Sequence, residues 1–157
     1  ERKEFVMKER FETFTVLINR ISRNIRKIKN QEMAEYNLRS PHISCLYYLY
    51  MAGELTATEL CERCEEDKAA ISRALDYLEK NGFIVCESKS AKRYKSPLSL
   101  TEKGNDVGKR IADKIAGVLN EISDGLTEEE RVAFYRSLAI ISESLERVCK
   151  SSEDKKG

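Results

Sequence analysis

The chain has 157 residues, of which 41% are hydrophobic and 35% are charged, and its formal net charge is +1. This composition excludes a disordered chain and is typical of a helix-rich globular protein. Because the net charge is nearly zero, any nucleic-acid function must rest on a local cluster of basic residues. No signal-peptide pattern and no bilayer-length apolar run occurs in the sequence, so we expect a cytoplasmic protein with no membrane partner.

Residues 4 to about 31 are predicted to form one long helix. Large apolar residues recur there at steps of three and four, as in a heptad seam: Phe11, Phe14, Ile18, Ile21, Ile25 and Ile28. We expect residues 1–35 to be an N-terminal dimerisation helix, with Phe11, Phe14, Ile18 and Ile21 at its interface. An intramolecular helical pair is the alternative.

The next helix is predicted to begin with Ser40 as its N-cap and Pro41 in its first turn. It carries the histidine and two of the tyrosines that we consider for a small-molecule pocket: His42, Tyr47 and Tyr50. Packing roles are the alternative for all three. Gly53 ends this helix, and Leu55 is predicted to add a short third strand to the sheet that follows.

Two short helices come next, and the second carries the main functional signal. Thr56 and Glu59 form a capping box for the first helix, and Asp67 is predicted to be the N-cap of the second. Gly82 stands where a left-handed C-terminal residue is required. One face of the second helix is apolar, and the other presents small, basic and aromatic residues suited to the major groove: Lys68, Ala69, Ala70, Ser72, Arg73 and Tyr77.

A β-hairpin is predicted after the second helix, from residues 83–86 and 97–100. The loop between these strands, Ser88 to Lys95, carries four positive charges and no acid, and Lys89, Lys92, Arg93 and Lys95 are predicted to meet DNA. A helix-turn-helix followed by such a hairpin is a winged helix, which we assign to residues 36–104. A solvated basic loop is the alternative.

Residues 105–157 are predicted to form C-terminal dimerisation helices and a tail. Thr101 caps the first helix, whose inward residues are predicted to be Val107, Ile111, Ile115, Val118, Leu119 and Ile122. Thr127 and Glu130 form a capping box for the second. Its seam includes Phe134 and four residues predicted to lie at the interface: Leu138, Ile141, Leu145 and Val148. The fold class is therefore mainly α with a small β-wing, flanked by long dimerisation helices.

Three motifs together resemble the multiple-antibiotic-resistance regulator (MarR) family. They are the pair Ser72-Arg73, the ending Leu78-Glu79-Lys80-Asn81-Gly82, and Leu100-Thr101-Glu102-Lys103-Gly104 after the wing. The resemblance implies a homodimer on a pseudo-palindromic double-stranded DNA operator, a repressor role, and a small-molecule effector bound between the dimer arms and the DNA-binding region.

Two departures from the family pattern affect the DNA-binding region. Lys92-Arg93 stands where the family usually has an Asp-Arg pair, so Arg93 loses its carboxylate brace. Glu65 and Glu66 precede the recognition helix, where acids repel phosphate.

The five cysteines include the pair Cys61 and Cys64, spaced as Cys-x-x-Cys inside a predicted helix. We interpret both as small buried packing residues, because no second pair follows and His42 is the only histidine. A thiol-based redox sensor on the same scaffold is one alternative function, and a winged-helix module that binds protein is another. We predict no catalytic, metal or cofactor site, because the sequence lacks a phosphate loop and a nucleophile with a histidine partner.

Overall fold

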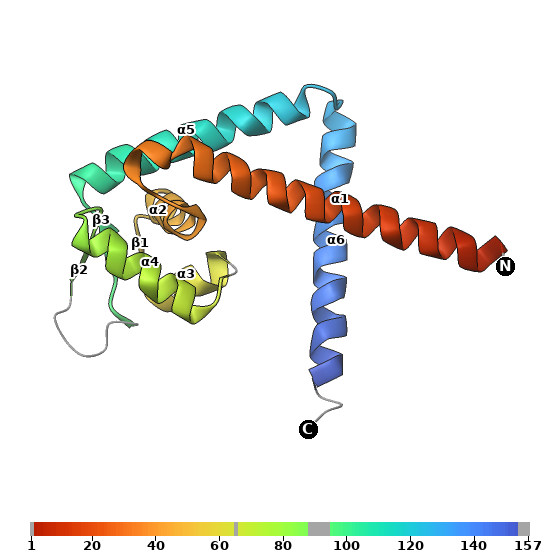
Figure 1. Ribbon diagram of the computed structural model, residues 1–157, viewed down its shortest axis with the longest axis horizontal. Coiled ribbons are helices and arrows are strands. Elements are labelled where there is room, and N and C mark those ends of the chain that lie inside the picture. Colours follow the sequence, from red (N-terminus) through yellow and green to blue (C-terminus); the bar gives the residue numbers. More distant parts are fainter. Residues whose placement is uncertain (1, 65, 88–94, 154–157) are drawn as a thin grey trace. The chain divides into compact units, whose positions relative to one another are not determined.

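The computed structural model describes residues 2–64, 66–87 and 95–153 (Figure 1). Backbone contacts divide the chain into two compact units, Glu1–Asp113 and Lys114–Gly157. The helices are α1 (Arg2–Glu32), η1 (Ala34–Tyr36), α2 (Ser40–Ala52), α3 (Ala57–Cys64), α4 (Lys68–Lys80), α5 (Glu102–Ser123) and α6 (Glu128–Glu153). The strands are β1 (Glu54–Leu55), β2 (Ile84–Cys86) and β3 (Leu98–Leu100). The predicted fold class, mainly α with a small wing sheet, is confirmed.

The three strands form one antiparallel sheet in the order β1-β3-β2. In the pairing of β2 with β3, Ile84 lies opposite Leu100 and Cys86 lies opposite Leu98. Leu55 lies opposite Leu98 on the other edge of β3, which confirms the predicted third strand. The sheet is short, so its stability depends on the helices packed against it.

Helix α2 is the central element of the first unit and contacts α1, α3, α4, β1 and β3 (Figure 1). Its inward residues Leu46 and Leu49 are fully buried. Helix α2 packs against α4, whose apolar residues Ile71 and Leu78 are also fully buried. A helix that is apolar on most sides requires such surrounding partners. Burial of these side chains is the main stabilising contribution within this unit.

The predicted caps of α3 and α4 are present. Thr56 N donates to Glu59 Oε2 at 2.8 Å, and Glu59 N donates to Thr56 Oγ1 at 3.2 Å. Ala70 N donates to Asp67 Oδ1 at 2.7 Å. Hydrogen bonds from Thr56 lower the pKa of the Glu59 carboxyl. These bonds satisfy amide donors that the first turn of each helix leaves unpaired.

The predicted N-cap of α2 is wrong by one residue. Arg39 is the cap, in extended conformation, and Ser40 is the first helical residue. Arg39 N donates to His42 Nδ1 at 3.0 Å, so the histidine ring accepts the bond that a capping-box carboxylate usually accepts. Ser40 N donates instead to Asn30 Oδ1 of α1, at 2.9 Å.

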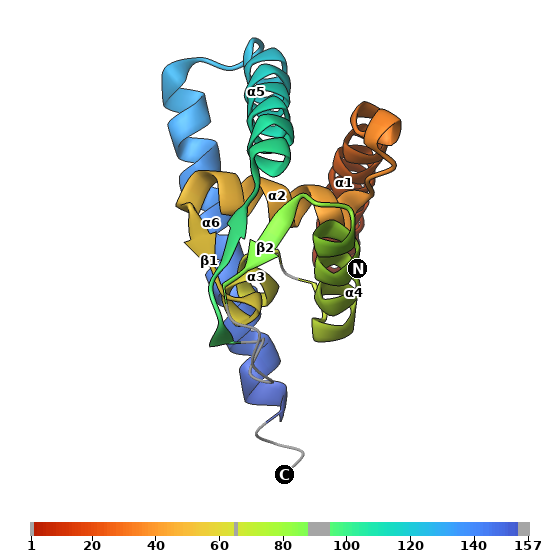
Figure 2. The same cartoon turned by 90° about the vertical axis from the view of Figure 1, so that its left-hand side faces the viewer.

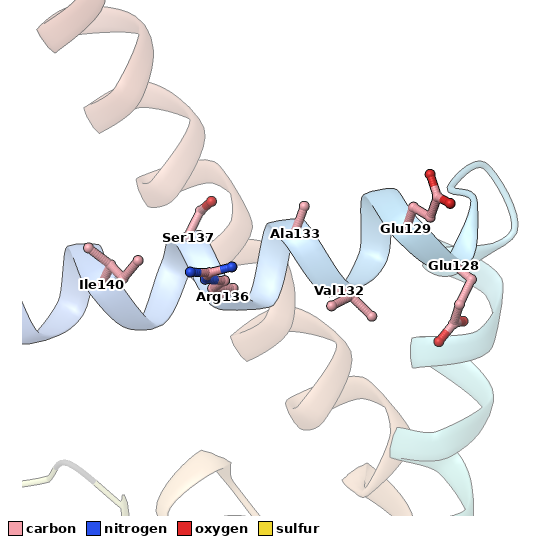
Figure 3. A pocket seen from close by; sticks show the side chains of 7 residues that line it. All are labelled: Glu128, Glu129, Val132, Ala133, Arg136, Ser137 and Ile140. Carbon is pink, nitrogen blue, oxygen red and sulfur yellow. The ribbon is translucent and has the colours of Figure 1, made fainter.

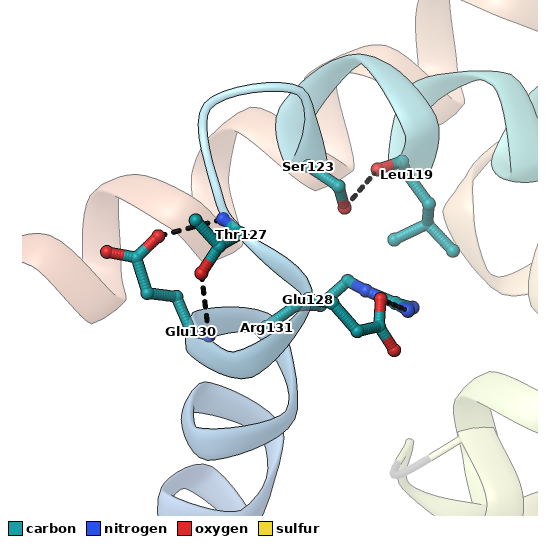
Figure 4. Close-up of polar contacts among 6 residues, drawn as sticks. All are labelled: Leu119, Ser123, Thr127, Glu128, Glu130 and Arg131. Carbon is teal, nitrogen blue, oxygen red and sulfur yellow. Dashed lines mark hydrogen bonds and ion pairs between the residues drawn. The ribbon is translucent and has the colours of Figure 1, made fainter.

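The second unit contains the end of α5 and all of α6. The capping box at its turn is present: Thr127 N donates to Glu130 Oε2 at 2.8 Å, and Glu130 N donates to Thr127 Oγ1 at 3.2 Å (Figure 4). Glu128 and Arg131 form an ion pair one turn apart on the surface of α6. Local hydrogen bonds therefore fix where α6 begins.

Candidate nucleic-acid interface

The pair α3 and α4 has the geometry of a helix-turn-helix, with α4 as the recognition helix. Ile71, Ala74, Leu75 and Leu78 of α4 are buried, so the opposite face is open. On that open face Lys68, Ala69 and Arg73 are exposed, and Ala70 and Ser72 are half-buried. Small residues near the N-terminus leave room for base edges, and the basic side chains can reach bases or phosphates.

Tyr77, a predicted DNA contact on α4, has a packing role in the structure. Its ring stacks on His42 of α2, with centroids 4.6 Å apart, and its hydroxyl donates to the backbone oxygen of Asn37 at 3.3 Å. Burial and the nearby Arg39 charge lower the pKa of His42, which favours the neutral ring. Tyr77 therefore ties α4 to α2.

The wing follows α4 along the chain, as β2 and β3 (Figure 2). Lys95 is exposed just before β3. The predicted contacts Lys89, Lys92 and Arg93 lie outside the described residues. Their positions in the sequence still place three positive charges in the connection between the two strands.

The motifs at the two ends of the wing meet at one point. Gly82 has φ of +73°, and Phe83 N donates to Leu78 O at 2.8 Å, which ends α4 in a Schellman motif. Thr101 Oγ1 donates to Gly82 O at 2.6 Å and accepts from Gly104 N at 3.0 Å. One threonine therefore caps α5 and also holds the end of the recognition helix.

Gly104 is required at this junction because no side chain fits there. A Cβ built on Gly104 would lie 1.9 Å from the backbone oxygen of Phe83. A Cβ on Gly108, one turn later, would lie 2.9 Å from Cβ of Tyr50 in α2. The glycine of the Leu-Thr-x-x-Gly motif thus allows α5 to approach the turn after the recognition helix.

The sequence of this region matches a known family. Residues 36–93, which contain the helix-turn-helix, match the family model described as the MarR family. The part of the chain that contains the helix-turn-helix is therefore similar to the MarR family. An HTH-type transcriptional regulator of Bacillus cereus is 29% identical to this chain over 129 residues, which cover 82% of this chain and 86% of that protein.

Two solved structures share the fold of this chain. The Staphylococcus aureus MepR–DNA complex superposes with a TM-score of 0.72 at 20% identity, over 84% of this chain and 97% of that one. Bordetella bronchiseptica BpsR, whose DNA binding is regulated by 6-hydroxynicotinic acid, superposes with a TM-score of 0.71 at 19% identity. The superposition covers 83% of this chain and 98% of that one. The Bacillus cereus relative is an HTH-type transcriptional regulator, and the two solved structures show that this chain has the fold of DNA-binding regulators.

A second surface of interest comes from the long helices, whose apolar seams are open to solvent in the single chain. On α1, Ile21 and Ile25 are 48% and 49% exposed. On α6, Leu145 and Val148 are 52% and 61% exposed. Phe14, Ile18 and Ile141 are also exposed, Leu138 is half-buried, and the side chain of Phe11 lies outside the described part of the chain. These seams are apolar faces that one chain leaves uncovered.

The apolar side chains of helix α5 are buried in its first half and exposed near its end. Val107 and Ile111 are buried, as predicted. Leu119 and Ile122 were predicted to point inward, but in the single chain they are 43% and 64% exposed. The periodicity identifies the apolar face correctly, but it does not show what covers that face.

The predicted ligand residues His42, Tyr47 and Tyr50 are all half-buried on α2. The ring of His42 stacks on Tyr77, and the ring of Tyr47 meets Tyr48 edge-on at 5.3 Å. A separate surface hollow lies along α6 and is lined by residues of that helix alone, among them Val132, Arg136 and Ile140 (Figure 3). One helix cannot enclose a ligand, so this hollow by itself does not form a ligand cavity.

Cys61 and Cys64 are less buried than the predicted packing role requires. Cys61 and Cys64 are half-buried, whereas Cys45 of α2 is fully buried. Cys64 and Cys45, 19 positions apart in the chain, influence each other's ionisation: Cys64 raises the pKa of the Cys45 thiol, and Cys45 lowers the pKa of the Cys64 thiol. The Cys-x-x-Cys spacing drew attention to Cys61, and no sequence signal pointed to Cys45. Among the described residues no cluster of three or more metal-ligating side chains occurs, and no helix there combines the length and apolar character of a membrane span.

Proposed function

We propose that this protein is a homodimeric repressor of the MarR family that binds a pseudo-palindromic DNA operator and is released by a small-molecule ligand. The observation that carries the proposal is the open apolar seams of α1 and α6 in a chain that also presents a recognition helix. Exposed leucine and isoleucine side chains at heptad spacing are stabilised when a second copy covers them. Two-fold symmetry then presents two copies of α4 to DNA.

The proposed DNA contacts divide between two elements. Lys68, Ala69, Ala70, Ser72 and Arg73 on α4 meet the major groove, where Arg73 reads a base edge. Lys89, Lys92, Arg93 and Lys95 in the wing meet phosphate or a narrow minor groove. We expect half-sites about one helical turn apart, roughly 10 base pairs. The proposed division of the chain remains an N-terminal arm (residues 1–35), the DNA-binding region (36–104) and C-terminal arms (105–157).

The proposed ligand response is supported by BpsR, which shares the fold and whose DNA binding a small aromatic acid regulates. In this chain the aromatic side chains His42, Tyr47 and Tyr50 lie half-buried on α2, the helix that packs directly against α4. A ligand that binds DNA-free and DNA-bound arrangements with different affinity shifts the equilibrium between them. We place the effector next to these residues for that reason.

The dimer is tested with Ile21→Asp combined with Leu138→Asp. The matched control is Asn19→Asp with Ala139→Asp, which adds the same charge to exposed positions away from both seams. Light scattering should show a monomer for the first variant and a dimer for the control. Titration of duplex DNA selected from a random pool should show loss of tight binding in the seam variant only. If the seam variant binds as tightly as wild type, dimerisation through these arms is wrong.

A further inference from the structure

The connection between α1 and α2 is a short turn with its own backbone hydrogen bonds. Two apolar residues anchor it, because Met33 and Leu38 are buried at 6% and 2% exposure. Tyr36 N and Leu38 N both donate to Met33 O, at 3.1 and 3.3 Å. Asn37 has a left-handed conformation, with φ of 56°, and its N donates to Ala34 O at 3.0 Å. These bonds fix the direction in which the chain leaves α1.

Polar contacts also hold this connection to the helices around it. Ser40 N, in the first turn of α2, donates to Asn30 Oδ1 of α1 at 2.9 Å. Arg110 of α5 forms an ion pair with Glu35 at 3.2 Å and donates to the hydroxyl of Tyr36. The ion pair is exposed and contributes little stability by itself. Together the contacts give the start of α2 a defined place relative to the end of α1.

One side chain of the recognition helix reaches this connection. The hydroxyl of Tyr77 donates to the backbone oxygen of Asn37 at 3.3 Å. The ring of Tyr77 stacks on His42, with centroids 4.6 Å apart and planes at 26°. His42 Nδ1 in turn accepts from Arg39 N at 3.0 Å, at the start of α2. Tyr77 therefore contacts both the connection and the first turn of α2.

These contacts differ in kind from the rest of the packing between α2 and α4. The buried residues Ile71 and Leu78 contribute through the hydrophobic effect, which is non-directional. A hydrogen bond and a stacked ring pair depend on angle as well as on distance. Tyr77 is thus suited to fix the angle of α4 at the end of α2 that joins α1.

We propose that Tyr77 is a positioning residue that sets the angle between the recognition helix and the N-terminal arm, and with it the half-site spacing that the dimer accepts. The inference rests on the proposed dimeric DNA-binding function, since spacing has meaning only for two copies of α4. One added base pair moves a half-site by about 3.4 Å and rotates it by roughly 35°. Recognition helices held at a fixed angle do not follow this change.

Spacing variants of one duplex test the proposal. The selected operator is compared with duplexes that have one base pair inserted or deleted between the half-sites. Wild-type protein should bind the altered duplexes about tenfold more weakly, because the DNA must be twisted to realign the half-sites. Tyr77→Leu, which removes the ring and the hydroxyl, should reduce this difference to about threefold.

Two results with Tyr77→Leu would overturn the proposal. One is a spacing preference equal to that of the wild type. The other is equally weakened binding to every duplex, random DNA included, with a lower salt slope, because that pattern describes a direct phosphate contact.

Matched variants separate positioning from stability. His42→Gln removes the stacked ring but keeps an acceptor for Arg39 N, as in a capping box, and should lose the spacing preference as Tyr77→Leu does. Ile71→Val lowers stability on the same helix without removing either contact, and should keep the preference. A wild-type preference in His42→Gln, or a lost preference in Ile71→Val, would contradict the assignment. His42→Gln decides the question if Tyr77→Leu does not fold.

Hydrogen exchange of the free protein gives a readout that does not depend on DNA. In Tyr77→Leu the amides of Asn37, Leu38 and Arg39 should exchange faster than in the wild type, because the connection opens more often. In Ile71→Val the ratio of their exchange rates to those of α4 should not rise. Equal exchange in wild type and Tyr77→Leu would overturn the inference. If the wild type instead fails to bind duplex DNA or shows no spacing preference, the proposed dimeric DNA-binding function fails.

Discussion

The winged core and the two long arms, α1 and α6, differ in how much of their apolar surface one chain covers. In the core, Leu46, Leu60 and Leu78 are fully buried. In the arms, Ile25 and Leu145 are about half exposed, at 49% and 52%. Both regions have the same helical periodicity in sequence. The core is therefore stabilised by contacts within the chain, and the arms have apolar faces that a second chain would stabilise.

The largest expected effect comes from removing a core side chain. Leu46→Ala should lower the free energy of unfolding by about 2–5 kcal/mol, because it leaves a cavity among packed helices. Ile25→Ala on α1 should change the stability of the monomer by less than about 0.5 kcal/mol. Chemical denaturation at several protein concentrations measures both. If Ile25→Ala is as costly as Leu46→Ala in dilute monomer, the distinction between core and arms is wrong.

The glycine at the wing junction gives the next largest effect. Gly104→Ala should destabilise the protein by about 1–3 kcal/mol, because its Cβ collides with the backbone of Phe83 and α5 must shift. Gly117→Ala, on the same helix with open space around it, should stabilise by about 0.8–1 kcal/mol. Thermal unfolding of the two variants compares them directly. If both substitutions changed the stability in the same direction, the close approach of α5 to Phe83 would not explain the glycine at position 104.

Within the winged core, the proposed DNA contacts on α4 and in the wing should differ in how strongly they depend on the DNA sequence. Arg73→Ala should weaken the specific site more than random duplex, by about 1–3 kcal/mol of discrimination. Arg93→Ala should weaken both duplexes alike and lower the log-log salt slope by about 0.9. A salt titration of each variant on selected and scrambled duplex measures these effects. If Arg93→Ala leaves the DNA affinity and its salt dependence unchanged, the proposed role of the wing is wrong.

The smallest expected effect concerns the cap of the recognition helix. Asp67→Ala removes the acceptor for Ala70 N and should cost about 1 kcal/mol of unfolding free energy. Asp67→Asn keeps a capping side chain and should cost much less. Equal losses in the two variants, measured by urea denaturation, would mean that the carboxylate charge and not the capping bond matters.

Local signals in the sequence predicted the helix boundaries well. The capping boxes Thr56–Glu59 and Thr127–Glu130 span three residues each, so the sequence contains both partners side by side. The left-handed Gly82 follows from the same local logic. The start of α2 was missed by one residue because Asn30, ten positions earlier, takes the amide of Ser40.

Contacts between distant positions were the ones that the sequence did not reveal. The stack of Tyr77 on His42 joins α2 to α4, 35 positions later in the chain. Tyr77 looked like a groove-facing residue because its helical phase borders the open face. Periodicity gives the direction of a side chain only to within a face of the helix, and a neighbouring aromatic ring then decides its contact.

The hydrogen bonds of Thr101 have a mechanical consequence for regulation. The hydroxyl joins the last turn of α4, through Gly82, to the first turn of α5, through Gly104, and Lys103 Nζ adds a bond to Asn81 O at 2.9 Å. These hydrogen bonds hold the end of the recognition helix against the start of α5. We therefore expect a tilt of the first turn of α5 to move the end of α4 with it.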